Sequence, residues 1–208
     1  MSLHQNATHG FSLIELMLAL SMGVLLCAGI FNLFMAMNTL HQRQIALSRT
    51  QEKMRFLSIF LRGKIQSAGN WSCLSQSDTP KSVVIRSYNA KQAYDKLGLT
   101  IKSKTDLLQL RECIRFHSKL RYLPMAFFVA DTFRKQNQHT VYALFYKIMH
   151  HPREELITNI TSFTVRLYHL PHLKKNIRAV KIQYLLQSRY VMPFSQLGIL
   201  YVARRSAT

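Results

Sequence analysis

The chain has few acidic residues, with 9 Asp and Glu against 28 Lys and Arg among 208 residues, and its formal net charge at pH 7 is +19. Pairs of carboxylates for general acid–base catalysis are therefore scarce. The sequence also lacks the G-x-S-x-G, H-E-x-x-H and Cys-x-x-Cys patterns and any glycine-rich phosphate-binding loop. These absences predict a protein that is not an enzyme and that needs no cofactor.

Lysine and arginine are missing from residues 1–40, where Glu15 is the single acid. The apolar run from Phe11 to Leu40 exceeds the roughly 20 residues that cross a bilayer as a helix. A cleaved secretory signal would have an apolar core of about 7–15 residues behind a positively charged segment. Because residues 1–10 carry no Lys or Arg, we expect residues 11–40 to be a transmembrane helix rather than a conventional signal peptide.

Glu15 is unusual in such a helix, because a carboxylate in the centre of a membrane costs about 2.5–3.5 kcal/mol on insertion scales. If the chain were cut between Gly10 and Phe11, the new α-amino group of Phe11 would lie at the same membrane depth as Glu15 of a neighbouring copy. The two charges would then compensate each other where an unpaired charge is heavily penalised. This reasoning predicts that Glu15 is an assembly residue.

The segment Gly10-Phe11-Ser12-Leu13-Ile14-Glu15-Leu16 resembles the class III signal of type IV pilins and pseudopilins. The resemblance implies that a membrane aspartyl protease, the prepilin peptidase, cleaves after Gly10 and that the new N-terminal Phe11 is methylated. It also implies that Glu15 supplies the charge that sets the register of subunits in a filament.

Residues 41–69 are expected to continue the helix as an amphipathic segment. Apolar residues recur there mostly at spacings of three and four, and the charged residues lie mostly off this stripe. Since no proline occurs in residues 1–79, one helix of about 55 residues and about 80 Å is predicted. The apolar stripe consists of Ile45, Met54, Leu57, Leu61, Ile65 and Ala68.

Beyond Gly69 the hydrophobic period changes to that of strands, and the alternation at 163–168 and 179–187 predicts antiparallel sheet with one buried face. The predicted fold class is α+β and type IV pilin-like, with a long N-terminal helix packed on an antiparallel β-sheet domain. Its parts are a leader (1–10), a transmembrane helix (11–40), an amphipathic continuation (41–69) and a β-rich periplasmic domain (70–208). Candidate strands are 83–88, 106–111, 126–130, 141–148, 163–168 and 179–187.

Three later stretches resemble the PilW-type minor pilins. They are Phe60 to Gly69 followed by Cys73, Asp106 to Arg111 followed by Cys113, and Glu155 to Tyr168, which resembles a late strand of that group. The resemblance implies a non-enzymatic subunit whose partners are other minor pilins, the major pilin, the prepilin peptidase and the inner-membrane assembly platform. It implies a single-pass inner-membrane protein with a periplasmic C-terminal domain, later in the pilus fibre or at its base. A J-type pseudopilin of a type II secretion system is the alternative.

Cysteine usage fits an oxidising compartment, because Cys73 and Cys113 both lie in the exported region and could form a disulfide. Such a bond would close about 40 residues and stabilise the fold by roughly 3–4 kcal/mol on the chain-entropy model. Two free buried thiols are the alternative. Cys27 lies in the anchor, where a small apolar packing role is expected.

Positive charge is the feature that could add an activity, because residues 41–208 contain 28 basic and 8 acidic residues, a difference of +20. Basic clusters near tyrosines, above all Lys174, Lys175, Arg178 and Lys181, are typical of DNA-binding surfaces. Pili of this family can mediate DNA uptake, so the resemblance makes DNA a possible partner. The alternative is a basic surface that meets anionic envelope components or an acidic neighbouring subunit. His150-His151 and His169 with His172 are expected to be surface-loop residues rather than metal ligands.

Overall fold

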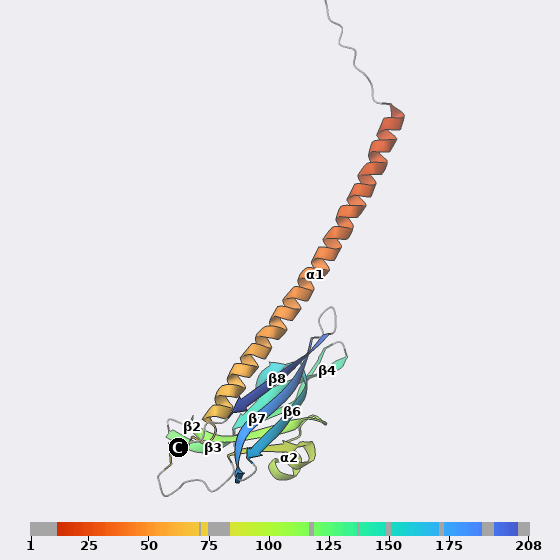
Figure 1. Cartoon of the computed structure of the whole chain (residues 1–208). Helices are drawn as coiled ribbons and strands as arrows, with labels where there is room; N and C mark the ends of the chain where they lie inside the picture. The colour runs from red at the N-terminus through yellow and green to blue at the C-terminus, as the bar shows by residue number, and fades with distance from the viewer. Residues whose placement is uncertain are drawn as a thin grey trace, which may run out of the picture. The chain divides into compact units, whose positions relative to one another are not determined.

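The computed structural model describes residues 12–70, 72–74, 84–116, 119–136, 138–148, 151–170, 173–188 and 194–203. Its fold is α+β, with one long N-terminal helix and a C-terminal set of antiparallel strands, which confirms the predicted class (Figure 1). Helix α1 (Leu13–Ser67) runs for 55 residues. By its contacts the chain divides into two compact units, Met1–Ile45 and Ala46–Thr208.

The first unit contains the apolar part of α1. Successive residues that point in different directions around the helix are all exposed, as Leu16, Met17 and Leu18 show with 59%, 66% and 56% exposure. In the described part of the chain, α1 is the one helix that is long and apolar enough to cross a membrane, and none of its most apolar 18-residue window is buried. A helix that is apolar all round and covered by no protein suits hydrocarbon surroundings. This unit therefore has the properties of a single-pass membrane anchor.

In the second unit, the remainder of α1 packs on the strands through the predicted apolar stripe from Met54 onward, whereas Ile45, the first residue of that prediction, is 38% exposed and belongs to the first unit. Leu57, Leu61 and Ile65 are fully buried at spacings of four, and Ala68 is 4% exposed. The helix ends at Ser67, two residues before Gly69, whose φ of 85° is the left-handed conformation that favours glycine after a helix. We call residues 46–67 of α1 the stem.

The strands form two antiparallel sheets in which each strand pairs with its neighbours in sequence. The first sheet has the order β1-β2-β3-β4-β5 and the second β6-β7-β8. The first consists of β1 (Ile85–Asn89), β2 (Asp106–Phe116), β3 (Lys119–Gln136), β4 (His139–Ile148) and β5 (Glu154–Thr158). The second consists of β6 (Ile160–Leu170), β7 (Leu173–Ser188) and β8 (Phe194–Ala203).

The main core lies between the stem and both sheets, and a second cluster lies on the other face of the first sheet beside the short helix α2 (Ala90–Leu97). The first sheet is thus covered on both faces. For this reason Met125 to Ala130 of β3 are all buried, whereas in β6 the buried Phe163 and Val165 alternate with the more exposed Thr164 and Arg166. The solvent-facing side predicted from residues 163–168 and 179–187 therefore belongs to the second sheet and not to the first.

Three features differ from the sequence prediction. The stretch Glu155 to Tyr168 is not one strand, because Asn159, with φ of 65°, separates β5 of the first sheet from β6 of the second. The Asn159 N–H donates to the Tyr142 carbonyl in β4 and its own carbonyl accepts from Gln187 in β7, at 2.8 Å each, so this residue links both sheets. Helix α2 and strands β5 and β8 are not among the predicted elements, and Val83, expected in the first strand, lies outside the described residues.

Candidate functional site

The N-terminal end of α1 carries the residue for which an assembly role was predicted. The Ser12 N–H donates to the Glu15 carboxylate at 3.2 Å, and the Ser12 carbonyl accepts from Leu16 N–H at 3.2 Å. Ser-x-x-Glu is the spacing of a helix capping box, and a carboxylate in the first turn also interacts favourably with the helix dipole. Glu15 therefore has a local partner that the sequence prediction overlooked. Gly10 and Phe11 lie outside the described residues.

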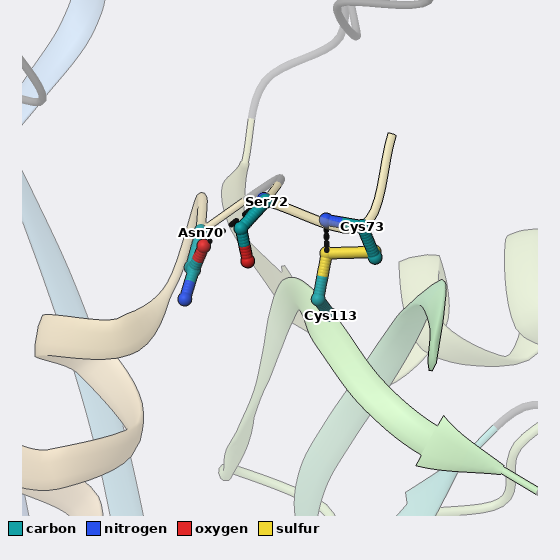
Figure 2. The surroundings of a disulfide bond; sticks show 4 residues. All are labelled: Asn70, Ser72, Cys73 and Cys113. Carbon is teal, nitrogen blue, oxygen red and sulfur yellow. Dashed lines mark hydrogen bonds between the residues drawn. A yellow bond between two sulfur atoms is a disulfide. The ribbon is translucent and has the colours of Figure 1, made fainter. Parts of the chain in front are cut away.

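The C-terminal end of α1 is fastened to β2 covalently. Cys73 and Cys113 form a disulfide with their Cα atoms 5.9 Å apart, so the paired alternative holds for these two cysteines (Figure 2). Two backbone hydrogen bonds flank it, from Gly69 N–H to the Arg111 carbonyl at 2.8 Å and from Cys113 N–H to the Asn70 carbonyl at 3.0 Å. The chain leaving the helix is thus held along one stretch of β2.

A buried ion pair strengthens the same junction. Glu112 of β2 is 5% exposed, and its carboxylate accepts from Lys64 Nζ at 2.6 Å and from the hydroxyl of Ser67. A buried carboxylate is tolerated when it is paired and hydrogen-bonded in this way. Lys64 and Ser67 lie three residues apart and therefore on one face of the last turns of α1. We call Lys64, Ser67, Glu112 and the disulfide the stem lock, and its chemistry is that of a structural junction.

A groove of about 520 Å³ lies between the stem and the strands. Lys53 donates from Nζ to the Thr158 hydroxyl at 3.0 Å, and burial, followed by the nearby charge of Arg49, lowers the pKa of Lys53. Among the described residues that line the groove beside this amine, none is a His or a Cys. The lining residues are Ala46, Arg49, Thr50, Glu52, Lys53, Phe56, Glu155, Leu156, Ile157, Thr158, Asn159, Leu186 and Gln187.

The structure describes only part of the cluster that was predicted to contact an anion or DNA. Lys174, Lys175 and Arg178 belong to β7 by their backbone, and their side chains lie outside the described part. Lys181 is described, and its Nζ lies 5.1 Å from the centre of the Tyr201 ring, a cation–π contact between β7 and β8.

The histidine pairs do not form a described metal site. His169 lies in β6 rather than in a loop, and His151 lies in a bend after β4. His150 and His172 lie outside the described residues. Among the residues that the structure describes, no group of three His, Cys, Asp or Glu side chains is placed to hold a metal ion.

Comparison with known proteins identifies one matching family model, the prokaryotic N-terminal methylation motif, over residues 5–31. The match includes Gly10, Phe11 and Glu15 and extends into the apolar part of α1. It supports the type IV pilin and pseudopilin superfamily and a structural rather than enzymatic protein. No curated protein and no solved structure gives a significant match to the chain.

Proposed function

We propose that this protein is a minor pilin of the PilW type, a structural subunit that primes type IV pilus assembly or is incorporated at the tip or base of the fibre. The observation that carries the proposal is the N-terminal methylation motif, which directly precedes and enters an apolar helix with no buried residue in its most apolar window. In this proposal the chain is cleaved after Gly10, Phe11 is methylated, and Glu15 sets the register of the subunit in the filament.

The second unit supports a structural role. The stem is buried on its apolar stripe and its end is held by the disulfide and by the Lys64–Glu112 ion pair. A stem joined so firmly to its sheets is suited to a structural part of a folded subunit. In the proposed arrangement the domain lies in the periplasm and meets other minor pilins and the major pilin, while the prepilin peptidase and the assembly platform act at the inner membrane.

The decisive experiment is mass spectrometry of the N-terminal peptide of the membrane-extracted protein, from cells with and without prepilin peptidase. We expect a peptide that begins at methylated Phe11 only when the peptidase is present. A peptide that still begins at Met1 in both strains, or cleavage beyond Leu26, would refute the pilin assignment.

A J-type pseudopilin of a type II secretion system would carry the same N-terminal motif. A genetic experiment is therefore needed to distinguish a pilus subunit from a secretion subunit. We expect deletion of the gene to remove surface pili and to leave secreted proteins at their normal level. The opposite result, with normal pili and lost secretion, would assign the chain to the secretion system.

A further inference from the structure

Strand β8 forms one edge of the second sheet and lacks the features that usually protect an edge. It pairs with β7 without a register shift, from Ala179 opposite Ala203 to Ser188 opposite Phe194. Its sequence, FSQLGILYVA, contains no charged residue and no proline. Natural edge strands are commonly protected by charges, proline, bulges or short length. A regular strand of 10 residues without any of these is an open template for another strand.

The other sheet edges are protected. Strand β5 has 5 residues, carries Glu154 and Glu155, and shifts its register against β4. Strand β1 also has 5 residues, carries Arg86 and leads directly into α2. Strand β6 packs against the strands of the first sheet, and the N–H of its Val165 donates to the Asp106 carboxylate of β2 at 2.9 Å. Among the edges that the structure describes, the missing protection is therefore particular to β8.

The outer face of β8 is apolar where an outer face is usually polar. Leu197, Ile199 and Tyr201 are 57%, 49% and 59% exposed, whereas Leu200 and Val202 between and beyond them point into the core. We call Leu197, Ile199 and Tyr201 the edge face. Figure 1 shows β8 as the last strand beside β7. Contiguous exposed apolar side chains on one strand are typical of an interaction surface.

Two cations stand at one end of the edge face. Lys181 is opposite Tyr201 in the β7–β8 register and places its Nζ 5.1 Å from that ring. On the other side of β7, Arg166 of β6 is opposite Lys181, and it is exposed. An incoming strand would thus meet apolar side chains along its length and positive charge at one end.

This charge decides which occupant fits. Opposite charges across an interface favour association and select the partner, and like charges oppose it. A second copy of this chain would bring a formal net charge of +19 against the same charge. Strand addition to an open edge uses main-chain hydrogen bonds for affinity and alternate side chains for specificity. The occupant that fits is a strand with alternating apolar residues and a carboxylate opposite Lys181 and Arg166.

We propose that β8 is the docking edge for an acidic pilin-like subunit, which extends the second sheet by one strand and covers the edge face. The proposal rests on the proposed function for the kind of partner, a different subunit of the same filament. In this proposal Lys181 and Arg166, at the end of the edge face, select the acidic partner. The main chain of β8 and the side chains of Leu197, Ile199 and Tyr201 provide the affinity.

The test uses the full chain in detergent together with each of the other pilin-like subunits of the same organism, purified full length in the same detergent. Dissociation constants are measured at low and high salt. Ile199→Lys places a charge in the edge face and should weaken binding of a net-acidic subunit at least 10-fold. Binding of the unchanged chain should also weaken as salt is raised, because charge attraction is screened.

A matched pair of variants controls for the loss of an exposed tyrosine. Tyr201 in the edge face and Tyr94 on α2 are similarly exposed, at 59% and 64%. Tyr201→Ser should weaken binding several-fold, whereas Tyr94→Ser should leave it unchanged. The thermal midpoint of each variant shows that the fold is kept, and Leu197→Lys replaces Ile199→Lys if the latter does not fold.

The proposal is overturned if folded Ile199→Lys or Leu197→Lys binds every subunit like the unchanged chain, if no subunit binds, or if the chain pairs with itself through β8. A different result would refute the proposed function itself, namely an N-terminus that is never processed at Phe11. A chain that is processed at Phe11 and supports pili, yet binds its subunits independently of β8, would refute the edge proposal alone.

Discussion

Lys64 Nζ lies 2.6 Å from Glu112 Oε1, which joins the last turns of the stem to β2 one residue before the disulfide. The Glu112 side chain is 6% exposed and that of Lys64 is 31% exposed. The carboxylate is therefore the member of the pair that depends on its partner, because water reaches the amine and not the acid. The ion pair and the disulfide act on neighbouring residues of the same strand, so the end of the helix has one position relative to the sheet.

Lys64→Met should destabilise the second unit, because it leaves a buried carboxylate with the Ser67 hydroxyl as its remaining side-chain donor. Breaking a buried pair costs about 3–5 kcal/mol, and the partial exposure of Lys64 lowers the expected loss to roughly 2 kcal/mol. Denaturant unfolding of the full chain in detergent measures it. Lys64→Met combined with Glu112→Leu should cost less than the two single changes added together, and strict additivity would contradict the pairing.

Loss of the disulfide should also lower the stability of the second unit. The two cysteines are 40 residues apart, and on the chain-entropy model a bond that closes a loop of that size contributes about 3–4 kcal/mol. Cys73→Ser with Cys113→Ser should lower the free energy of unfolding by this amount and make it insensitive to reductant. Cys27→Ser is the control, because this exposed thiol lies in the first unit and should leave the unfolding of the second unchanged.

Tyr184 of β7 lies across Gly198 of β8 and reaches the stem. A Cβ added at Gly198 would meet ring atoms of Tyr184 at 2.3 Å. The Tyr184 hydroxyl is 3.0 Å from the Ser58 hydroxyl. Gly198→Ala should therefore destabilise the second unit by about 1–3 kcal/mol, because the buried ring has to shift. Equal unfolding free energies for Gly198→Ala and the unchanged chain would show that the ring moves freely.

Tyr184→Phe should keep the packing and remove the hydroxyl that contacts the stem twice, at the Ser58 hydroxyl (3.0 Å) and, as donor, at the Met54 carbonyl (3.4 Å). A loss of about 1 kcal/mol is expected for a neutral hydrogen bond of this kind. Ser58→Ala removes the contact between the two hydroxyls alone, so the double variant should lose little more than Tyr184→Phe by itself. Two additive losses in denaturant unfolding would mean that the hydroxyls act independently.

The stability of the second unit should fall in strongly alkaline solution because of Tyr146. Its hydroxyl donates to the Glu154 carboxylate, and this hydrogen bond, followed by burial, raises the Tyr146 pKa from 10.0 to about 12. The folded state thus holds the proton more tightly than the unfolded state does. The stabilisation is complete below pH 10 and is lost as pH rises from 10 to about 12. Tyr146→Phe should show a smaller fall over that range, measured by denaturant unfolding at each pH.

The anchor and stem could be predicted from the sequence because their signals are local. The absence of proline permits one long helix, and the spacing of Leu57, Leu61 and Ile65 identifies the face that the structure buries. The stem lock could not be derived in the same way. Lys64 and Glu112 are 48 residues apart in sequence, and nothing in one sequence states which strand an amine on a helix will reach.

Helix α2 and strand β8 could not be predicted from hydrophobic periodicity, for physical reasons. In β8 both faces are apolar, because Leu200 and Val202 enter the core while Leu197 and Ile199 remain exposed, so no alternation of polar and apolar residues marks a strand. Helix α2 has 8 residues, and its apolar stripe consists of Ala90, Ala93 and Leu97, which is too short and too rich in alanine to be identified by periodicity alone. Its signal was in the caps, where Asn89 and Gln92 form a capping box and Gly98 ends the helix with φ of 61°.

Glu15 has an observed contact at the start of α1 and a proposed role in assembly, and Glu15→Gln separates the two. The structure shows the carboxylate accepting from Ser12 N–H, and glutamine at this position of a capping box can accept in the same way. The proposed role in assembly needs the negative charge, since only a charge compensates the amino group of Phe11 in a neighbouring copy. We therefore expect Glu15→Gln to keep cleavage at Gly10 and membrane insertion but to lower incorporation into filaments as strongly as Glu15→Ala. Mass spectrometry of the N-terminal peptide and the amount of protein in sheared filaments measure the two effects. Normal incorporation of Glu15→Gln together with failure of Glu15→Ala would assign the residue to helix capping rather than to subunit register.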